Sequence, residues 1–329
     1  MAELDYTRAI EILDSAHTIC VCGHINPDGD CLGSVMALTL ALRAQGHSVT
    51  PLLATTDKVA QLDFLEGYDE LKPAREYLAV PDVFVAVDVS EKDRLGDAEA
   101  IFNRAAKTIL IDHHVGPADY ADACYVDDTA AAAGILVWAM LKQMGAERTA
   151  QIASWCYAAL VTDTGRFQFQ NADARALRCA AELVESGADP SDICTNIYQR
   201  KSLAALKFES RVIERLEFLC EKRAAISWIT RADYAELNAT KDDSDSLIDV
   251  VRQIAGVEVA VMLREEDDYV RGSIRSKTTR NVAEIAAKMN GGGHIAAAGF
   301  TVYGTLDEAR ELVKKHIETS YEQHPAEEA

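Results

Sequence analysis

The first half of the chain alternates short apolar runs with longer helical patterns, and this alternation constrains the fold more than any other feature. The short runs predict strands over 18–22, 49–53, 83–89 and 108–111, and the longer patterns predict helices over 32–45 and 134–144. Strand and helix signals in alternation are typical of a parallel sheet with helices packed on its faces. The sequence therefore predicts an α/β fold with an N-terminal doubly wound, mostly parallel sheet.

A second and smaller α/β domain is expected after a helical stretch. Strands are predicted over 224–229, 257–263 and 272–276, and a helix over 281–289, while 172–222 has a helical pattern. Because the chain has 329 residues, more than one core usually organises, two domains are expected. We predict a first domain over 1–190, a helical connector over 191–222, a second domain over 223–320 and a disordered tail over 321–329.

Net charge and composition restrict the partners and the cell compartment that are expected for this chain. A formal net charge of −20 opposes sequence-independent binding to long duplex DNA, so a polyanionic substrate needs a local basic site or a metal ion. The N-terminus does not resemble a secretory signal, and the longest apolar run, 130–141, is shorter than a membrane span. The eight cysteines form no dense framework, which favours reduced thiols. We expect a cytoplasmic protein without membrane association, and a homodimer is possible.

The loop after the first predicted strand holds one imidazole and two carboxylates, those of His24, Asp28 and Asp30. Carboxylates this close repel each other unless they are protonated or bound to a cation, so the loop indicates a metal site. Asp28-Gly29 is also favourable turn chemistry, and an aspartate there can cap the following helix. Both interpretations remain open for this segment taken alone.

Three more segments place acids or histidines after apolar stretches. The strand 108–111 runs into Asp112, His113 and His114, and two further apolar stretches end at Asp88 and Asp163. In open parallel sheets, ligands bind beyond the carboxyl ends of the strands, so residues far apart in sequence can meet there. Either Asp88 or Asp163 alone could instead cap a helix.

Together these segments offer four carboxylates and two neutral imidazoles, which two divalent cations would balance in charge. The candidate ligands are His24, Asp28, Asp30, Asp88, His113 and Asp163. Mixed nitrogen and oxygen ligands suit Mn²⁺, with Mg²⁺, Co²⁺ or Fe²⁺ as alternatives. Because no cysteine is among these ligands, a structural zinc site is not expected.

The four segments, in this order, resemble the DHH phosphoesterase family, whose name corresponds to Asp112, His113 and His114 here. The ending GGGHIAAAG from Gly291 resembles its DHHA1 companion domain, and the compact size is most similar to the nano-RNase and 3′-phosphoadenosine-5′-phosphate (pAp) phosphatase group. The resemblance implies a hydrolase of phosphoric esters, of the 3′–5′ exoribonuclease or nucleotide phosphatase type. Its substrates would be short oligoribonucleotides, pAp or both, attacked by water that two metal ions activate.

The resemblance also implies individual roles. One metal would be held by His24, Asp28 and Asp88, and the other by Asp30, Asp88, His113 and Asp163. Asp112 would support His113, and His114 would face the substrate phosphate, so Asp112 and His114 are the expected catalytic residues.

Substrate binding is expected in the second domain. Gly291, Gly292 and Gly293 let backbone N–H groups approach phosphate oxygens, and His294 follows at once, although a plain turn would also use three glycines. Arg275 and Ser276 end a strand in a basic stretch that could clamp phosphate, or could instead protect an exposed edge strand.

Three alternatives remain. A phosphodiesterase for cyclic di-AMP or pApA would use the same two domains, and an inorganic pyrophosphatase or exopolyphosphatase would use the same metal loop. The third is a non-catalytic nucleotide-binding module. Relatives often carry Ser or Thr and then Glu where this chain has Ala130–Ile135, which predicts that a small polar contact near the metal site is missing.

Overall fold

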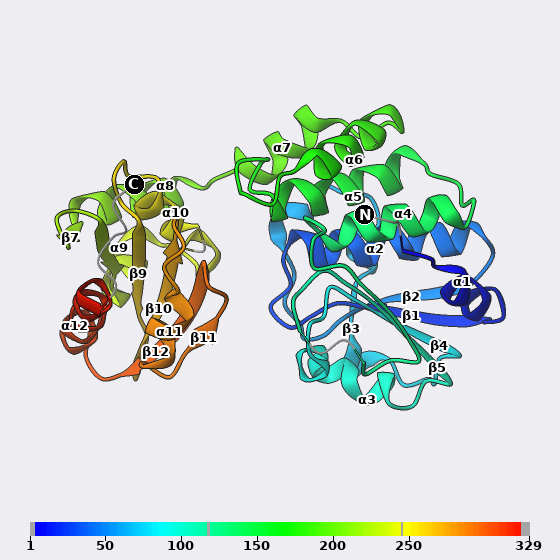
Figure 1. Cartoon of the computed structure of the whole chain (residues 1–329), viewed down its shortest axis with the longest axis horizontal. Coiled ribbons are helices and arrows are strands. Elements are labelled where there is room, and N and C mark those ends of the chain that lie inside the picture. Colours follow the sequence, from blue (N-terminus) through cyan, green and yellow to red (C-terminus); the bar gives the residue numbers. More distant parts are fainter. Residues whose placement is uncertain (1–3, 117–118, 245, 324–329) are drawn as a thin grey trace. The chain divides into compact units, whose positions relative to one another are not determined.

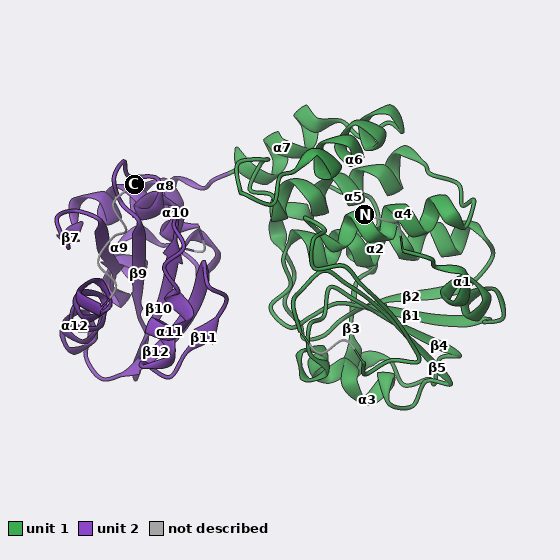
Figure 2. Cartoon of the chain, in the orientation of Figure 1, with its two compact units in different colours: residues 1–200 green, residues 201–329 purple. Residues whose placement is uncertain are grey.

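The computed structural model describes residues 4–116, 119–244 and 246–323. The chain forms two compact units, Met1–Arg200 and Lys201–Ala329 (Figure 2). The boundary falls inside 191–222, the segment expected to connect two domains. Each unit has its own sheet and its own hydrophobic core.

Unit 1 contains a six-stranded sheet in which all strands are parallel. In spatial order it reads β3-β2-β1-β4-β5-β6, so the chain winds outward in both directions from the centre. The strands are β1 (Thr18–Cys22), β2 (Ser48–Leu53), β3 (Lys72–Pro73), β4 (Val83–Val87), β5 (Lys107–Asp112) and β6 (Ala123–Val126). The predicted doubly wound parallel sheet is therefore confirmed.

Helices cover both faces of this sheet (Figure 1). Alternate strand residues such as Val85 and Ile109 face a core shared with α2, α4 and α5, and residues such as Phe84 and Leu110 face α3 and the turns before it. The helices of unit 1 are α1 (Thr7–Asp14), α2 (Gly29–Ala44), α3 (Glu99–Phe102), α4 (Ala133–Gln143), α5 (Ala150–Asp163), α6 (Ala174–Glu185) and α7 (Pro190–Tyr198). Because successive side chains of a strand point to opposite faces, each apolar strand contributes to a hydrophobic core on either side of the sheet.

Two predicted boundaries shift for local reasons that matter for function. The helix expected from residue 32 begins at Gly29, because the Asp28 side chain accepts a hydrogen bond from the backbone N–H of Cys31 at 3.0 Å and caps the helix. The strand expected over 83–89 ends at Val87, because Asp88 adopts a left-handed backbone with φ of 61°. In both places, an aspartate lies immediately outside a regular element, Asp28 before α2 and Asp88 after β4.

The close packing of α2 on α5 requires a glycine at position 33. A Cβ on Gly33 would lie 2.7 Å from the carbonyl oxygen of Trp155 and 2.8 Å from Cβ of Ala159. Because these neighbours are another helix's backbone and Cβ, they cannot yield cheaply. We expect Gly33→Ala to lower the free energy of unfolding of unit 1 by about 2 kcal/mol, measured by urea denaturation. Gly116→Ala is the control, since its Cβ would meet only a carbonyl oxygen at 3.7 Å; equal midpoints for both variants would contradict the expectation.

Unit 2 contains a second six-stranded sheet, in the order β11-β12-β10-β9-β8-β7, with only β8 and β9 parallel. Its strands are β7 (Glu217–Leu219), β8 (Ala224–Ile229), β9 (Val259–Glu265), β10 (Tyr269–Ser276), β11 (Gly292–Gly293) and β12 (Ala297–Tyr303). Its helices are α8 (Leu203–Glu214), α9 (Arg231–Leu237), α10 (Leu247–Arg252), α11 (Val282–Ala287) and α12 (Leu306–Gln323). One core joins the sheet to α11 and α12, and another joins it to α8 and α10. The smaller C-terminal α/β domain is thus confirmed.

The segment expected as a helical connector is divided. Its first part is α7 of unit 1, and α8 belongs to unit 2. The helical pattern predicted through residue 222 is wrong after α8, because Glu217–Leu219 form β7 and Cys220, Glu221 and Lys222 make a left-handed turn into β8. At the far end, α12 reaches Gln323, so the rest of the predicted tail lies outside the described residues. None of the described helices is both long and apolar enough to cross a membrane.

Candidate metal centre and phosphate site

Unit 1 gathers acids and histidines at the carboxyl edge of its sheet. His24 follows β1, Asp88 follows β4, and Asp112 ends β5. Since β4 lies between β1 and β5, the residues after these three strands are neighbours in space. The start of α2 adds Asp28 and Asp30, and the last residue of α5 adds Asp163. The structure therefore brings all six predicted metal-ligand residues into one cluster.

Asp88 lies at the middle of this cluster. Its Oδ2 is 3.3 Å from Nε2 of His24, and its Oδ1 is 3.4 Å from Nε2 of His113. The carboxylate is buried, and within the described part of the chain Oδ1 accepts no hydrogen bond. One carboxylate thus faces two imidazoles that follow two different strands, so it could serve cations bound on either side.

Both histidines are oriented through their other ring nitrogen. Nδ1 of His24 lies 2.7 Å from the carbonyl oxygen of Ile25, and Nδ1 of His113 lies 3.1 Å from that of Ala130. A carbonyl oxygen can only accept, so the proton of the neutral ring sits on Nδ1 and Nε2 faces the cluster. Nε2 of His113 is then 3.5 Å from Asp30 and 3.8 Å from Asp163.

The two aspartates of α2 have different supports. Oδ2 of Asp30 accepts from the backbone N–H of Ala133 at 2.6 Å, and Oδ1 accepts from that of Gly134 at 2.9 Å, so the carboxylate sits at the start of α4. Asp28 uses Oδ1 to cap α2, while its Oδ2 lies 3.8 Å from Nε2 of His24. Helix capping and a place in the cluster, which the sequence left as alternatives, are both present.

Asp112 differs from its predicted role. Its Oδ1 lies 2.8 Å from Nδ1 of His114, whereas His113 is oriented by Ala130. The physical reason is the alternation of side chains along an extended chain, which turns residues i and i+2 to the same side. Asp112 therefore orients His114 and not His113.

The electrostatics show how much positive charge the cluster lacks. Burial lowers the pKa of His24 and His113, but the facing carboxylates, with Asp88 the largest contributor, together outweigh it and raise these pKa values to about 9 and about 11. Burial and the neighbouring Asp88 carboxylate raise the pKa of Asp30 to about 7, and burial and the Asp30 carboxylate raise the pKa of Asp163 to about 8. Burial also acts on Asp88, yet the two histidines hold its pKa well below the ordinary value. In the absence of a cation, protons bound to the histidines and to some of the aspartates offset the negative charge of the cluster.

The donor set fits divalent cations. Ligand atoms that are each about 2.1 Å from one cation lie roughly 3 to 3.5 Å apart, close to the 3.3–3.8 Å separations here. One neighbour was not expected: the thiol of Cys31 can join His24 and Asp88 in a group whose ligand atoms lie within 4.8 Å of one another. Its position in the first turn of α2, three residues after Asp28, was the available signal.

Metal binding is therefore expected to release protons. At pH 7 the metal-free His24 and His113 are protonated, because their pKa values of about 9 and about 11 lie above that pH. Metal ligation needs neutral imidazoles, so about two protons or more should leave at pH 7, and affinity should rise as pH rises. Calorimetric titration with Mn²⁺ in buffers of different ionisation enthalpy measures this number. A heat that does not depend on the buffer would contradict the expectation.

Unit 2 brings the predicted phosphate-binding residues together. Arg275 and Ser276 end β10, and the backbone N–H of Ser276 donates to the carbonyl oxygen of Ala296 in the turn between β11 and β12 at 2.8 Å. Gly291, Gly292 and Gly293 lead into that turn, in which His294 and Ala297 exchange backbone hydrogen bonds. Gly291 is required sterically, because a Cβ there would lie 2.2 Å from the carbonyl oxygen of Gly299.

The two side chains of β10 are placed differently from each other. Arg275 is half-buried, and its guanidinium donates to the carbonyl oxygens of Ile274 and Ala298. Burial lowers the pKa of Arg275. Nearby Asp249 of α10 opposes this shift, and Arg252 of the same helix, a cation that the sequence did not single out, adds to it. Ser276 is buried with its hydroxyl near Thr278, so its backbone N–H, and not its side chain, meets the turn.

Comparison with known proteins gives a consistent result. Residues 18–161 match the model of the DHH family, N-terminal domain, and residues 222–319 match that of the DHHA1 domain. The chain is 31% identical over 300 residues to the bifunctional oligoribonuclease and PAP phosphatase NrnA of Thermus thermophilus, covering 91% of this chain and 89% of the relative. The protein of that name from Bacillus subtilis is 28% identical over 321 residues, covering 97% and 99%.

Solved structures share the fold. An exopolyphosphatase-related protein from Bacteroides fragilis has a TM-score of 0.91 at 24% sequence identity, covering 96% of each chain. Exonuclease RecJ bound to manganese has a TM-score of 0.54 at 14% identity, again covering 96% of each chain.

Proposed function

We propose, because this chain belongs to the DHH family of phosphoesterases and carries a DHHA1 domain, that it hydrolyses short oligoribonucleotides and pAp. That it is a hydrolase of phosphoric esters follows from the family. The choice of substrate is supported by two relatives named as bifunctional oligoribonuclease and PAP phosphatase, both aligned over nearly the whole chain. Action in the cytoplasm and assembly into a homodimer stay predictions.

The observation that carries the proposal is the position of Asp88 between His24 and His113, with carboxylates on either side. We propose that His24, Asp28 and Asp88 hold one divalent cation and that Asp30, Asp88, His113 and Asp163 hold a second. Such a pair, for which Mn²⁺ suits the ligands, supplies water activation and neutralises charge on the phosphate. All six residues lie in regular elements or within two residues of one, so the backbone of these elements fixes where each side chain begins.

The remaining residues orient and bind. The hydrogen bond to Asp112 fixes the His114 proton on Nδ1, so Nε2 is the nitrogen that serves the substrate. There it can stabilise charge on the phosphate or give a proton to the leaving oxygen. In unit 2, the backbone of the turn after Gly291 and the guanidinium of Arg275 offer donors for a terminal phosphate.

A substrate panel tests the function. Release of phosphate or mononucleotide is measured for pAp, a five-residue RNA, pApA, cyclic di-AMP and pyrophosphate, with Mn²⁺ and then with excess chelator. We expect pAp and the short RNA to be cleaved fastest, and only with metal. A preference for pApA or cyclic di-AMP would instead identify a dinucleotide phosphodiesterase, and preferred cleavage of pyrophosphate would identify a pyrophosphatase. Tight nucleotide binding without turnover would indicate a binding module.

Arg275 provides a more local prediction. Arg275→Ala should raise KM for pAp about tenfold, because a charge-assisted bond to phosphate is lost, while kcat changes little. Steady-state kinetics on the same substrate measure both constants. Arg271→Ala is the matched control, since Arg271 lies on the same strand and the same face but is exposed. Equal KM values for the two variants would count against a phosphate contact.

A further inference from the structure

The loop between β6 and α4 supports two members of the metal cluster through its backbone. The carbonyl oxygen of Ala130 lies 3.1 Å from Nδ1 of His113, and the N–H groups of Ala133 and Gly134 donate to the carboxylate of Asp30. The place of this loop therefore determines how both cluster side chains are held. Because its alanines have no polar side chains, the side-chain contacts that hold them come from elsewhere in the chain.

One such contact comes from Asn171, in the segment between α5 and α6. Its side-chain nitrogen Nδ2 lies 3.2 Å from the carbonyl oxygen of Ala131 and 3.1 Å from that of Asp163. A carbonyl oxygen only accepts, and the amide nitrogen carries two protons, so one side chain donates to both partners at once. Asn171 thus links the loop that supports His113 and Asp30 to the peptide group of Asp163.

The residues linked in this way are the three that are proposed to bind the second cation and not the first. Nε2 of His113 lies 3.5 Å from Oδ2 of Asp30 and 3.8 Å from Oδ2 of Asp163. These residues belong to β5, α2 and α5 or follow them directly, so no single element fixes the spacing between them. His24 and Asp28, which serve the first cation, are instead held by backbone groups within three residues of each.

The path of the chain after α5 brings Asn171 back to Asp163. Gly165, Arg166 and Phe167 have φ values of 53°, 62° and 60°, so three successive residues are left-handed and two of them carry side chains. Such conformations are unfavourable for L-residues and persist where the surroundings enforce them, often at functional sites. The sharp turn lets a side chain eight residues along the chain contact the last residue of α5.

A second contact from the same segment holds the beginning of the loop. Arg175, in the first turn of α6, places a guanidinium nitrogen 2.5 Å from Oδ2 of Asp127, and the hydroxyl of Thr129 donates to Oδ1 of the same carboxylate. Residues 171–175 therefore contact the loop at two points, Asp127 and Ala131. Of the two contacts, only the one from Asn171 also includes a cluster residue.

We propose that Asn171 is a positioning residue for the second cation, an inference that rests on the metal centre of the proposed function. It acts through the peptide groups of Ala131 and Asp163, and its amide is not one of the proposed ligands. Without it, the loop that supports His113 and Asp30 is no longer tied to the end of α5. Losing a contact that supports metal ligands typically costs about 10- to 100-fold in metal affinity. The first cation should be affected little.

Metal titration separates the two sites without any need for turnover. Calorimetry with Mn²⁺ counts the bound ions and gives the affinity of each. Asn171→Leu keeps the shape of the side chain but donates no hydrogen bond, so it should weaken one ion about tenfold and leave the other nearly unchanged. Asn196→Leu is the matched control, because the amide of Asn196 also donates to two oxygens, but only to those of Asp192 within α7.

Asp163→Asn identifies which ion is affected. This variant removes the charge of a ligand that is proposed for the second cation alone, so the ion whose affinity stays nearer to the wild-type value is the first. Adding Asn171→Leu to Asp163→Asn should leave the affinity of that ion unchanged. If Asn171→Leu weakens both ions equally, weakens neither, or weakens the first ion in the Asp163→Asn background, the positioning role is wrong.

Urea denaturation separates a local effect from unfolding. Asn171→Leu should keep the wild-type midpoint while it weakens one ion. Asn171→Ala removes the same amide without adding apolar surface, and it should give the same result if the leucine variant does not fold. A wild type that binds two Mn²⁺ ions but cleaves no nucleotide would contradict the proposed function, and the titrations would still decide the role of Asn171. A wild type that binds fewer than two ions would contradict the two-metal centre and this inference with it.

Discussion

Replacing Asp88 with asparagine is expected to reduce kcat for pAp by about 10³-fold or more, with the fold retained. Asp88 offers one oxygen to the side of His24 and the other to the side of His113, so the substitution removes a charge from both halves of the centre at once. Losing several kcal/mol of charge stabilisation corresponds to a rate loss of this size. Asparagine has nearly the same volume, so packing should survive.

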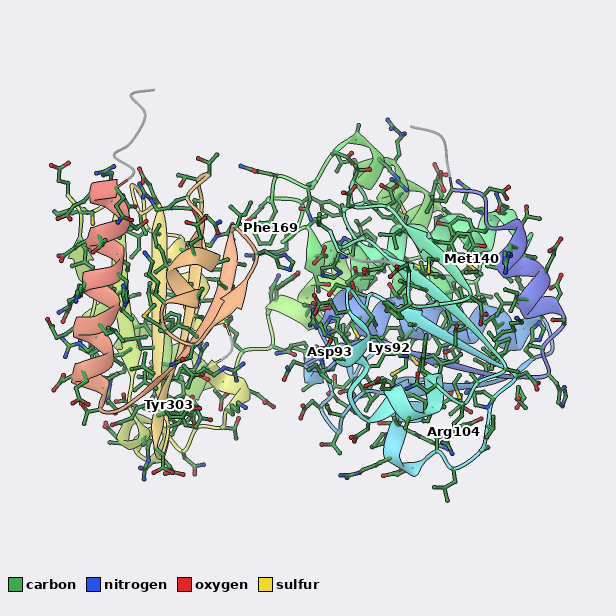
Figure 3. All side chains as sticks on the ribbon, turned by 60° about the horizontal axis from the view of Figure 1, so that its bottom comes forward. Lys92, Asp93, Arg104, Met140, Phe169 and Tyr303 are labelled. Atoms are coloured by element: carbon green, nitrogen blue, oxygen red, sulfur yellow. The ribbon has the colours of Figure 1, made fainter. Side chains whose placement is uncertain are left out.

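Three measurements separate this expectation from a folding defect. Steady-state kinetics with saturating Mn²⁺ give the rate, calorimetry gives the metal stoichiometry, and urea denaturation gives stability. We expect metal affinity to fall together with kcat, because the amide cannot ligate through two charged oxygens. Asp93→Asn is the control, since Asp93 is an exposed aspartate of unit 1 (Figure 3). An Asp88→Asn enzyme within tenfold of the wild type would remove the central ligand from the proposed centre.

The strand ends were predictable from sequence because periodicity fixes both the strands and their direction. Apolar runs before His24, Asp88 and Asp112 predict strands, and parallel pairing brings the residues that follow them to one edge. The sequence alone therefore places the charged side chains of the cluster at this edge. The same reasoning recovered β8 in unit 2 at Ala224–Ile229, which is buried and flanked by polar turns.

Backbone groups were not predictable, since they leave no residue signature. Asp30 is held by two N–H groups at the start of α4, and His113 by the carbonyl oxygen of Ala130. In sequence this stretch of alanines suggested a lost polar contact. Small residues there also let α4 lie close to α5: a Cβ at Gly134 would lie 2.7 Å from Cβ of Ala159. Asp30 accepts one side-chain hydrogen bond as well, from the Ser34 hydroxyl at 3.0 Å, and the loss of a polar contact at Ala130–Ile135 stays a prediction.

Non-glycine residues with a left-handed backbone were also not predictable from the sequence. Asp88, Arg166 and Phe167 have positive φ although none is a glycine, and propensity gives no warning of such positions. They are set by the surrounding packing, and all three lie in the cluster or within four residues of Asp163. The predicted end of the helix that contains α8 was also wrong, because the helical pattern continues into residues that form β7 and pair with β8.

The second large effect concerns His114, because it separates catalysis from metal binding. His114→Ala should lower kcat by about 10²–10³-fold and leave the number of bound Mn²⁺ ions unchanged. Nδ1 of His114 lies 3.4 Å from Oδ1 of Asp88 but only 2.8 Å from Oδ1 of Asp112, and we propose that the shorter contact holds the ring for a role toward substrate and not as a metal ligand.

Asp112→Asn tests the contact between Asp112 and His114 by changing the residue that orients the ring. The asparagine can still hold the ring in place but can present its amide to Nδ1, which favours the wrong tautomer; we expect a loss of about tenfold to 10²-fold in kcat with KM nearly constant. His17→Ala is the control, since His17 is exposed. If His114→Ala keeps full turnover, proton transfer and charge stabilisation belong elsewhere. If it loses turnover together with Mn²⁺, His114 is a ligand, and the division between the Asp112–His114 pair and the six-residue cluster does not hold.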